Sequence, residues 1–343
     1  MPTSLFNDVF GNDAFGFLSL TEAVNNMPYV ESRLGQLGLF NGLVEGTDTD
    51  MVVIDETEGQ LQIMTTLPRG ADPQKALKDK KAKSRAIKIP HLSFEDTIQA
   101  SSLLGKCAPG KNQLETVAQK VNDRFQWMLN QVVAPTLEVH RLNALRGILL
   151  DADGVTVIHD YFTFFGVAQQ TKNFQFSLAT VNVREQCHQA IRLIEDYLDG
   201  VSYTGVRALC GRTFFDNLIK HPSVRDTYLN WTAAAELRGD MRKREFEFGG
   251  IVFEEYRGMR NLPNGLGVVP DAEAIIFPEG VSGMYRTYYA PADFLETVNE
   301  LGQPLYAKVA PDWKYNRWVD TLIESNPLHI NVRPRAVLKA TQS

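Results

Sequence analysis

The sequence predicts an α+β fold in which one long helix lies among short strands that precede and follow it. Apolar residues recur at helical spacing through residues 111–147, which indicates an amphipathic helix. Strand-like runs lie on both sides of this helix, and residues 274–337 are rich in strand and turn signals. The chain has no internal repeat and no low-complexity segment. Together these features indicate the α+β class.

Residues 1–45 are expected to form an N-terminal arm and not a domain. Short apolar pairs alternate here with glycine, asparagine and proline, and a helix of one or two turns is indicated only around residues 18–25. So little periodic apolar surface cannot offset the conformational entropy that the segment would lose on becoming ordered by itself. We therefore expect the arm to bury its apolar side chains against other copies of the chain.

Residues 46–98 are expected to form strands from which a loop extends. The runs 51–54 and 61–64 are strand-like, and Glu58 and Gly59 between them are typical turn residues.

A second strand pair, residues 63–67 and 85–92, flanks a polar excursion, which places the extended loop at about residues 64–92. This excursion is basic. Its cationic residues are the candidate inter-subunit contacts, namely Arg69, Lys75, Lys78, Lys80, Lys81, Lys83, Arg85 and Lys88.

Three interpretations of the basic residues stay open. They suit a solvated loop, a hairpin that reaches an acidic surface of a partner, or direct binding to nucleic acid. No aromatic residue lies between Gly70 and Ile89, so the charges are not accompanied by side chains on which bases could stack.

The helix of residues 111–147 is predicted by apolar side chains three, four and seven positions apart. Pro135 predicts a kink or a break in this spine helix, because proline lacks the amide hydrogen that a helix interior requires. Gly147 is its expected end. A continuous helix of this span would be about 55 Å long, which suits a structural spine.

After the spine, residues 148–150 and 155–158 are predicted strands joined by a turn at residues 151–154. A further helix is expected at residues 183–198. Strand and helix signals then alternate at residues 206–209, 213–221 and 246–256.

The turn at residues 151–154 also contains the one candidate catalytic motif. An apolar strand ending in Asp151-Ala152-Asp153-Gly154 resembles the first motif of haloacid-dehalogenase-type phosphatases, where the first aspartate attacks phosphorus, the second acts as acid and base, and both help to hold Mg²⁺. Thr213 and Lys220 would have to supply the later residues, and no acidic pair completes the metal site. A hairpin turn is the simpler interpretation. An Mg-dependent phosphatase using Asp151 and Asp153 is kept as the alternative function.

Composition and spacing disfavour several other classes. A formal net charge of −6 argues against a protein that coats nucleic acid through a basic surface. Cys107, Cys187 and Cys210 are widely spaced, as is typical of free thiols in a reducing compartment, and the histidines lack metal-ligand spacing. The sequence begins without the features of a signal peptide, and no apolar run approaches the roughly 20 residues that cross a bilayer. We expect no cofactor, no metal, no membrane association, and synthesis in the cytoplasm.

Four stretches occur in an order that chance alone would hardly produce. They are Arg85-x-x-Lys88-Ile89-Pro90-His91 with Asp96-Thr97-Ile98-Gln99-Ala100; Glu138-x-x-Arg141-x-x-Ala144-Leu145-x-Gly147; Phe253-Glu254-Glu255-Tyr256-Arg257-Gly258; and Ala290-Pro291-Ala292-Asp293-Phe294 with Ser325-Asn326-Pro327-Leu328 and Arg333-Pro334. Through them almost the whole chain resembles the major capsid protein E family of lambda-type phages, which has the Hong Kong 97 capsid fold.

The resemblance implies a structural protein and not an enzyme. Hexamers and pentamers of the chain would form an icosahedral virion capsid, assembled in the host cytoplasm, that encloses double-stranded DNA without sequence-specific binding. A decoration protein at three-fold positions, a scaffolding protein and a portal are the other implied partners. Because the sequence shows no long, charged helical leader, we expect the scaffold to be a separate protein.

The resemblance also implies a division of the chain. The expected parts are an N-terminal arm (1–45), strands with the extended loop (46–98), a peripheral domain with the spine helix (99–185), an axial domain (186–304), and C-terminal strands that return to the peripheral domain (305–343).

Overall fold

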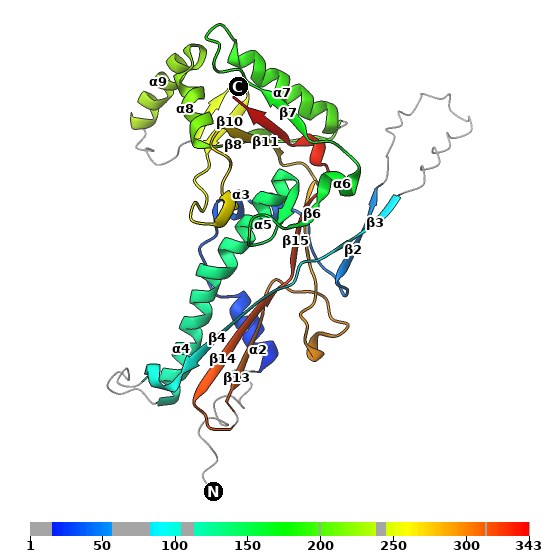
Figure 1. Cartoon of the computed structure of the whole chain (residues 1–343), viewed down its shortest axis with the longest axis vertical. Helices are drawn as coiled ribbons and strands as arrows, with labels where there is room; N and C mark the ends of the chain where they lie inside the picture. Colours follow the sequence, from blue (N-terminus) through cyan, green and yellow to red (C-terminus); the bar gives the residue numbers. More distant parts are fainter. Residues whose placement is uncertain are drawn as a thin grey trace, which may run out of the picture.

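The computed structural model describes residues 16–56, 83–103, 113–198, 200–237, 245–312 and 314–342. Figure 1 shows an elongated molecule with a helix-covered sheet at one end, a smaller sheet at the other, and a long helix that runs between them. The predicted α+β class is confirmed.

The larger body is built on a six-stranded sheet with the order β7–β16–β11–β8–β10–β9. Its central strand β8 runs parallel to β10 and antiparallel to β11. The strands are β7 (Gln170–Asn173), β8 (Gly205–Cys210), β9 (Glu245–Phe248), β10 (Ile251–Glu255), β11 (Glu273–Glu279) and β16 (Leu338–Thr341).

Three helices accompany this sheet, α7 (Val183–Leu198), α8 (Arg212–Lys220) and α9 (Pro222–Leu237). Helix α7 begins and ends where the sequence predicts it. Its buried residues recur every three or four positions, because only one face of the helix contacts the core. They are Val183, Cys187, Ala190, Ile194 and Leu198.

The spine consists of α4 (Gln113–Met128), a π-helical turn labelled η4 (Leu129–Val133) and α5 (Ala134–Arg146). The prediction of a long helix over residues 111–147 is therefore confirmed. It ends at Gly147, whose φ of 85° lies in the left-handed region that favours glycine. Helix α5 is buried on nearly all sides, whereas α4 buries one stripe that includes Val121, Phe125 and Met128.

The smaller sheet contains β4 (Leu92–Gln99), β14 (Trp318–Ser325) and β13 (Tyr306–Pro311), with β14 in the middle. Helix α4 contacts β14, and α2 (Phe17–Asn25) contacts β13. A second hydrophobic core lies between these elements, and it includes Leu20, Val24, Ile98, Phe125 and Ile323.

A third sheet connects the two bodies and contains β1 (Val44–Gly46), β12 (Tyr285–Tyr289) and β15 (Pro327–Asn331). Strand β1 pairs in parallel with β12, and β15 is buried along its whole length where it contacts α5. The N-terminal part of the chain is thus joined to its late strands.

The expectation that the arm buries its apolar groups only against other copies is wrong for the described residues 17–46. Leu20, Val24, Leu34 and Phe40 are each at most 2% exposed in the single chain. The short helices α3 (Arg33–Leu37) and η2 (Leu39–Asn41) lie against α5 and β12, which supply the apolar partner surface that the segment lacks by itself.

Two hairpins complete the described part. In one, β2 (Met51–Glu56) pairs with β3 (Lys83–Lys88). The expected pairing of residues 85–92 with residues 63–67 stays a prediction, because residues 63–67 lie outside the described residues. In the other, β5 (Ile148–Leu150) pairs with β6 (Val157–Asp160) as predicted.

The remaining short elements are η3 (Ala100–Leu103), α6 (Tyr161–Phe165), η5 (Pro263–Gly265), η6 (Leu295–Thr297) and η7 (Pro334–Ala336). Of the strands after residue 305, β13 and β14 belong to the smaller sheet, whereas β16 belongs to the six-stranded sheet. The division into arm, peripheral and axial parts stays a prediction, because those names describe positions in an assembly.

Candidate functional site

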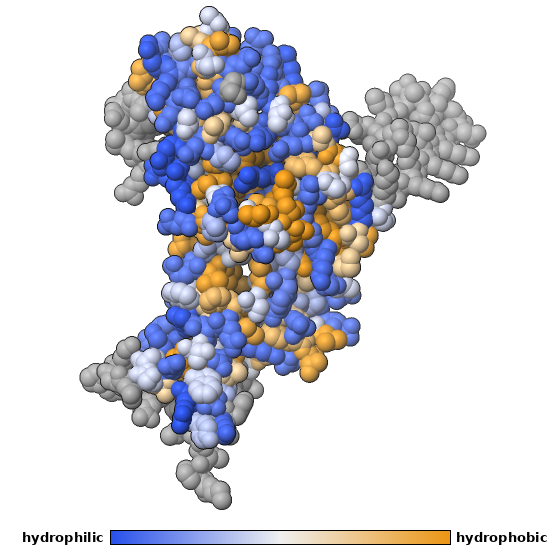
Figure 2. All heavy atoms as spheres, in the orientation of Figure 1, coloured by the Kyte–Doolittle hydropathy of each residue, from blue (hydrophilic) through white to orange (hydrophobic). Residues whose placement is uncertain are grey.

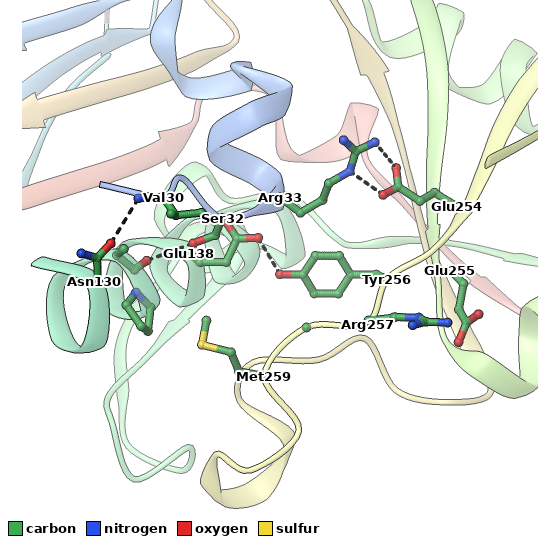
Figure 3. A pocket seen from close by; sticks show the side chains of 13 residues that line it. Val30, Ser32, Arg33, Asn130, Glu138, Glu254, Glu255, Tyr256, Arg257 and Met259 are labelled. Atoms are coloured by element: carbon green, nitrogen blue, oxygen red, sulfur yellow. Dashed lines mark hydrogen bonds and ion pairs between the residues drawn. The ribbon is translucent and has the colours of Figure 1, made fainter. Parts of the chain in front are cut away.

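The spine meets the six-stranded sheet at a group of polar side chains that we call the junction cluster. Its members come from α3, α5 and four strands or strand ends, and they are Arg33, Glu138, Arg207, Glu245, Glu254, Tyr256 and Glu279. A cavity of about 770 Å³ lies beside them, between α5 and the segment after β10 (Figure 3).

Glu254 is the centre of the cluster. Arg33 donates to both of its carboxylate oxygens, from Nε to Oε1 at 2.5 Å and from Nη2 to Oε2 at 2.9 Å (Figure 3). Arg207 donates from Nη1 to Oε2 at 2.9 Å. Two guanidinium groups therefore share one carboxylate that is only 8% exposed. Such bidentate pairs fix orientation as well as adding energy.

Two further carboxylates contact the same two arginines. Glu279 accepts a hydrogen bond from Nε of Arg207, and Glu245 accepts one from Nη2 of Arg33 and lies 3.4 Å from Nη1 of Arg207. The hydrogen bond to Glu254 raises the pKa of Arg33 despite its partial burial. Burial alone would lower the pKa of Arg207, but its carboxylate partners, Glu279 foremost, raise it. Both arginines stay charged and bound.

Glu138 joins the spine to α3 and to the segment directly after β10. Its carboxylate accepts the backbone N–H of Leu34 at 2.9 Å, which caps the start of α3. It also accepts the hydroxyl of Tyr256 at 2.8 Å (Figure 3). The side chain is 2% exposed. Burial raises the pKa of Glu138 even though these hydrogen bonds act in the opposite direction.

The cluster has the composition of an active site but not the arrangement of one. Its carboxylates are occupied by arginine, tyrosine or backbone donors, so none is poised as a free base. Among the residues that the structure describes, no group of three or more His, Cys, Asp or Glu could hold a metal ion. The junction cluster thus fixes the sheet on the spine.

Outside the cluster, burial raises the pKa of the Cys187 thiol to about 12, which keeps it protonated.

A second buried polar region lies where α5 contacts β15. The side chains of His140, Arg141, Asn143, His329 and Asn331 are each at most 8% exposed. Each has at least one polar atom without a hydrogen-bond partner in the described part of the chain. Burial lowers the pKa of His140 to about 4 and, together with the charge of Arg141, lowers that of His329 well below its usual value.

These histidines predict a loss of stability in acid. A base whose pKa is lowered by folding contributes stability that is complete above its unfolded pKa of about 6.5 and is lost as the pH falls toward the folded value. The free energy of unfolding of the unassembled chain should therefore drop by up to about 1.4 kcal/mol per pH unit for each histidine between pH 6.5 and about 4. Denaturant titrations at several pH values measure this slope.

The variant His140→Leu should flatten the slope, since it removes one of the histidines whose pKa is lowered by burial. The matched control His188→Leu alters an exposed histidine on α7 and should leave it unchanged. Equal slopes in the native chain and the His140→Leu variant would contradict the prediction.

The predicted contacts of the extended loop are described only at its base. Arg69, Lys75, Lys78, Lys80 and Lys81 lie outside the described residues, as does the side chain of Lys83. Arg85 lies over the ring of Phe164, with 5.9 Å from the guanidinium carbon to the ring centre. The Nζ atom of Lys88 lies 3.9 Å from Oδ2 of Asp50, and both side chains are 71% exposed. The role of the basic residues stays a prediction.

At the predicted kink, Pro135 is in the first turn of α5, directly after the π-helical turn. In a regular α-helix the proline ring would clash with the carbonyl of the residue four positions earlier. Here that residue belongs to the wider π-helical turn. The hydroxyl of Thr136 donates to the carbonyl of Val132 at 2.7 Å. The kink itself stays a prediction.

The candidate catalytic aspartates form the turn of the β5–β6 hairpin. The carboxylate of Asp153 accepts the backbone N–H groups of Val155 and Thr156 and the hydroxyl of Thr156. The Thr156 hydroxyl is the largest of the causes that lower the pKa of Asp153. Asp151 accepts the N–H of Ala152. These local bonds are those of a turn.

Sequence reasoning missed most of the junction cluster. Glu138 and Glu254 stand inside the stretches that carry the resemblance, but Arg33 belongs to the segment expected to be an arm, and it pairs with a residue 221 positions away. Arg207, Glu245 and Glu279 had no signal other than their charge.

Comparison with known proteins gives one consistent result. The family model described as phage major capsid protein E matches residues 17–342. The major capsid protein of Pseudomonas phage KPP10 is 30% identical over 350 aligned residues, which cover 95% of this chain and 96% of that protein. The major capsid protein of Salmonella phage Felix O1 is 24% identical and covers 85% of this chain and 87% of its own.

Among solved structures, a capsid protein of an Escherichia coli CFT073 prophage resembles this chain with a TM-score of 0.52 and 14% sequence identity. The alignment covers 99% of this chain and 98% of that one. In the described residues, no helix combines the length and apolar character needed to cross a membrane.

Proposed function

The chain belongs to the phage major capsid protein E family and builds a capsid shell, and we propose that it does so as hexamers and pentamers of an icosahedral shell around double-stranded DNA. The observation that supports this most is the match to another phage's major capsid protein over 95% of this chain and 96% of that protein. The fold is that of Hong Kong 97-type capsids, with a spine, a helix-covered sheet and an extended hairpin.

Electron microscopy of the purified chain in negative stain tests the proposal. We expect closed shells, tubes or rings of six and five subunits. A chain that stays monomeric at all concentrations and salt conditions would contradict it.

We further propose that the chain has no enzymatic activity. The phosphatase alternative has no support, because Asp151 and Asp153 hold a hairpin turn and no comparison points to a hydrolase. A scaffolding protein, a portal and a decoration protein at three-fold positions are proposed as partners, and the host cytoplasm is the proposed place of assembly.

The basic extended loop is proposed to contact a neighbouring subunit. We expect the variant in which Lys78, Lys80, Lys81 and Lys83 are all alanine to fold normally but to assemble less readily. Each exposed ion pair contributes about 0.2–1 kcal/mol, so four contribute roughly 1–4 kcal/mol per subunit. Light scattering as a function of subunit and salt concentration measures the change.

A matched control removes four exposed cations from the six-stranded body, namely Arg192, Arg212, Lys220 and Arg225. If both variants assemble equally poorly, the net charge of the subunit and not the loop controls assembly. Normal shells with unchanged salt sensitivity from the loop variant would also refute the contact.

A further inference from the structure

We propose that a cavity beside the middle of the spine binds a carboxylate carried on an apolar stem, and that Arg141 is the cation that pairs with it. This cavity, which we call the Arg141 cavity, has a volume of about 740 Å³ and lies between α2, the spine and the segment that joins β12 to β13. It is formed within the single chain, so the site goes beyond the proposed assembly and does not depend on it. Both a free molecule and an acidic side chain of a second copy supply a carboxylate of this kind.

Arg141 is a buried cation without a partner in the described part of the chain. Its side chain extends from α5, and the residue is 8% exposed. The Nε atom has no hydrogen-bond partner among the described residues, and none of their carboxylates forms an ion pair with the guanidinium group. Glu138 lies one helical turn earlier, but its oxygens accept from Leu34 and Tyr256. A desolvated cation is costly unless an anion pairs with it, which favours the binding of an anion here.

The guanidinium group of Arg141 is held in position by its packing. A Cβ atom at Gly35 would lie 2.7 Å from Nη1 of Arg141, so the glycine leaves the room that this nitrogen occupies. Gly35 belongs to α3, whose start is capped by Glu138. A cation that is fixed before the ligand arrives loses little entropy on binding.

Two tyrosine hydroxyls accompany the guanidinium group. Tyr29 and Tyr289 line the Arg141 cavity, and neither hydroxyl has a hydrogen-bond partner among the described residues. Burial raises the pKa of Tyr289, the charge of Arg141 acts in the opposite direction, and Tyr29 adds to the rise. The three groups therefore lie within electrostatic reach of one another. A guanidinium group and two phenol hydroxyls are hydrogen-bond donors, and a carboxylate accepts from both kinds.

The walls of the Arg141 cavity favour an apolar stem on this carboxylate. Figure 2 shows hydrophobic residues gathered in the middle of the molecule, beside the spine of Figure 1. The apolar side chains that line the cavity come from the spine and from the start of β13, and they include Leu129, Val133, Leu137 and Leu305. An aliphatic chain that covers them is removed from water together with them.

Exposed carboxylates at the same cavity exclude a more highly charged ligand. Glu22, Glu31 and Glu300 also line it, and all three residues are exposed. They repel a phosphate dianion or a nucleic-acid backbone, whereas a monocarboxylate brings one charge that Arg141 neutralises. The cavity should therefore select monocarboxylates over phosphates.

Ligand-detected NMR of the unassembled native chain, at constant ionic strength, tests this selection with hexanoate, acetate and inorganic phosphate. We expect saturable binding of hexanoate that is about tenfold tighter or more than that of acetate, since each buried methylene contributes a factor of roughly four. Phosphate should displace hexanoate less readily than acetate does. The proposal is overturned by a lack of saturable binding, by equal affinities for acetate and hexanoate, or by phosphate as the better competitor.

Arg141→Gln should weaken hexanoate binding about tenfold or more, and it should abolish the preference for hexanoate over the uncharged hexanamide. A merely structural arginine would not set that preference. Tyr289→Phe keeps the buried ring and should weaken binding roughly threefold, so it tests the site even if Arg141→Gln does not fold. The matched control Arg192→Gln changes an exposed arginine on α7 and should bind hexanoate like the native chain.

An unchanged preference for hexanoate in folded Arg141→Gln would overturn the proposal. So would native affinity in Tyr289→Phe where Arg141→Gln does not fold, or an equal loss of affinity in Arg192→Gln.

Cryo-electron microscopy of native shells prepared with excess hexanoate separates the two sources of the carboxylate. We expect density against the guanidinium group of Arg141, either from hexanoate or from an aspartate or glutamate of a second copy. A cavity that contains neither would overturn the proposal. If the native chain forms no shells, the proposed function fails, whereas the NMR titration of the unassembled chain still decides whether the site exists.

Discussion

Replacing Glu254 with alanine is expected to lower the free energy of unfolding by about 2–4 kcal/mol. Removing one partner of a buried ion pair costs roughly 3–5 kcal/mol, because the remaining charge stays desolvated and unpaired. Glu254 is 8% exposed and serves both Arg33 and Arg207, but the side chain of Arg33 is 33% exposed, so water would recover part of that loss.

Denaturant unfolding of the unassembled chain measures this change, with the m value checked for constancy. Glu247→Ala is the matched control, since it removes an exposed glutamate from the adjacent strand β9 and should change stability by about 0.5 kcal/mol or less. Glu254→Gln should cost less than Glu254→Ala, because an amide oxygen still accepts one guanidinium. Equal losses from Glu254→Ala and Glu247→Ala would show that the junction cluster contributes nothing.

Replacing Gly147 with alanine is expected to destabilise the chain by about 2–5 kcal/mol. A left-handed backbone at a non-glycine residue costs roughly 1–2 kcal/mol, and overpacking of a core adds about 1–3 kcal/mol. Both apply here, because Gly147 has a φ of 85° and a Cβ atom would lie 2.3 Å from the ring of Phe162.

A second glycine of the chain provides a control that separates the backbone strain from the clash with Phe162. Gly166 has a φ of 67°, but a Cβ atom there would have its nearest neighbour at 3.8 Å, so Gly166→Ala should cost only the backbone strain. Adding Phe162→Leu to Gly147→Ala should recover part of the larger loss in a double-mutant cycle. If the two glycine variants lose equal stability, the clash with Phe162 has no energetic weight.

Elements with a strong local pattern were predictable from the sequence. Helix α7 has one apolar stripe with spacing that only a helix satisfies, and its predicted bounds match the structure. The β5–β6 hairpin was predictable because its turn residues are local to it.

Pairing between distant segments was not predictable. The pairing of β3 with β2 was not among the expected strand pairs, because the register between separated segments depends on how they pack. The residues 63–67 that were expected to pair with this strand lie outside the described residues. Arg33 meets Glu254 only because α3 packs on the spine, and single-sequence periodicity contains no record of that contact. The extended loop's cations were identified by charge, and most of them lie outside the described residues.

The parallel pairing of β1 with β12 has a consequence for the timing of synthesis. Val44 pairs with Thr287, so β1 leaves the ribosome long before its partner has been translated. At about 5–20 residues per second, the interval is roughly 12–50 s. During it, neither this sheet nor the pairing of β4 with β14 can form.

Such non-local contacts also make folding slow, because loop closure precedes any gain from pairing. A nascent or truncated chain that ends before β12 therefore lacks the sheet that joins its two bodies. Until β15 has been translated, the chain cannot adopt the fold of the finished subunit, because the sheet that holds its two bodies together is incomplete.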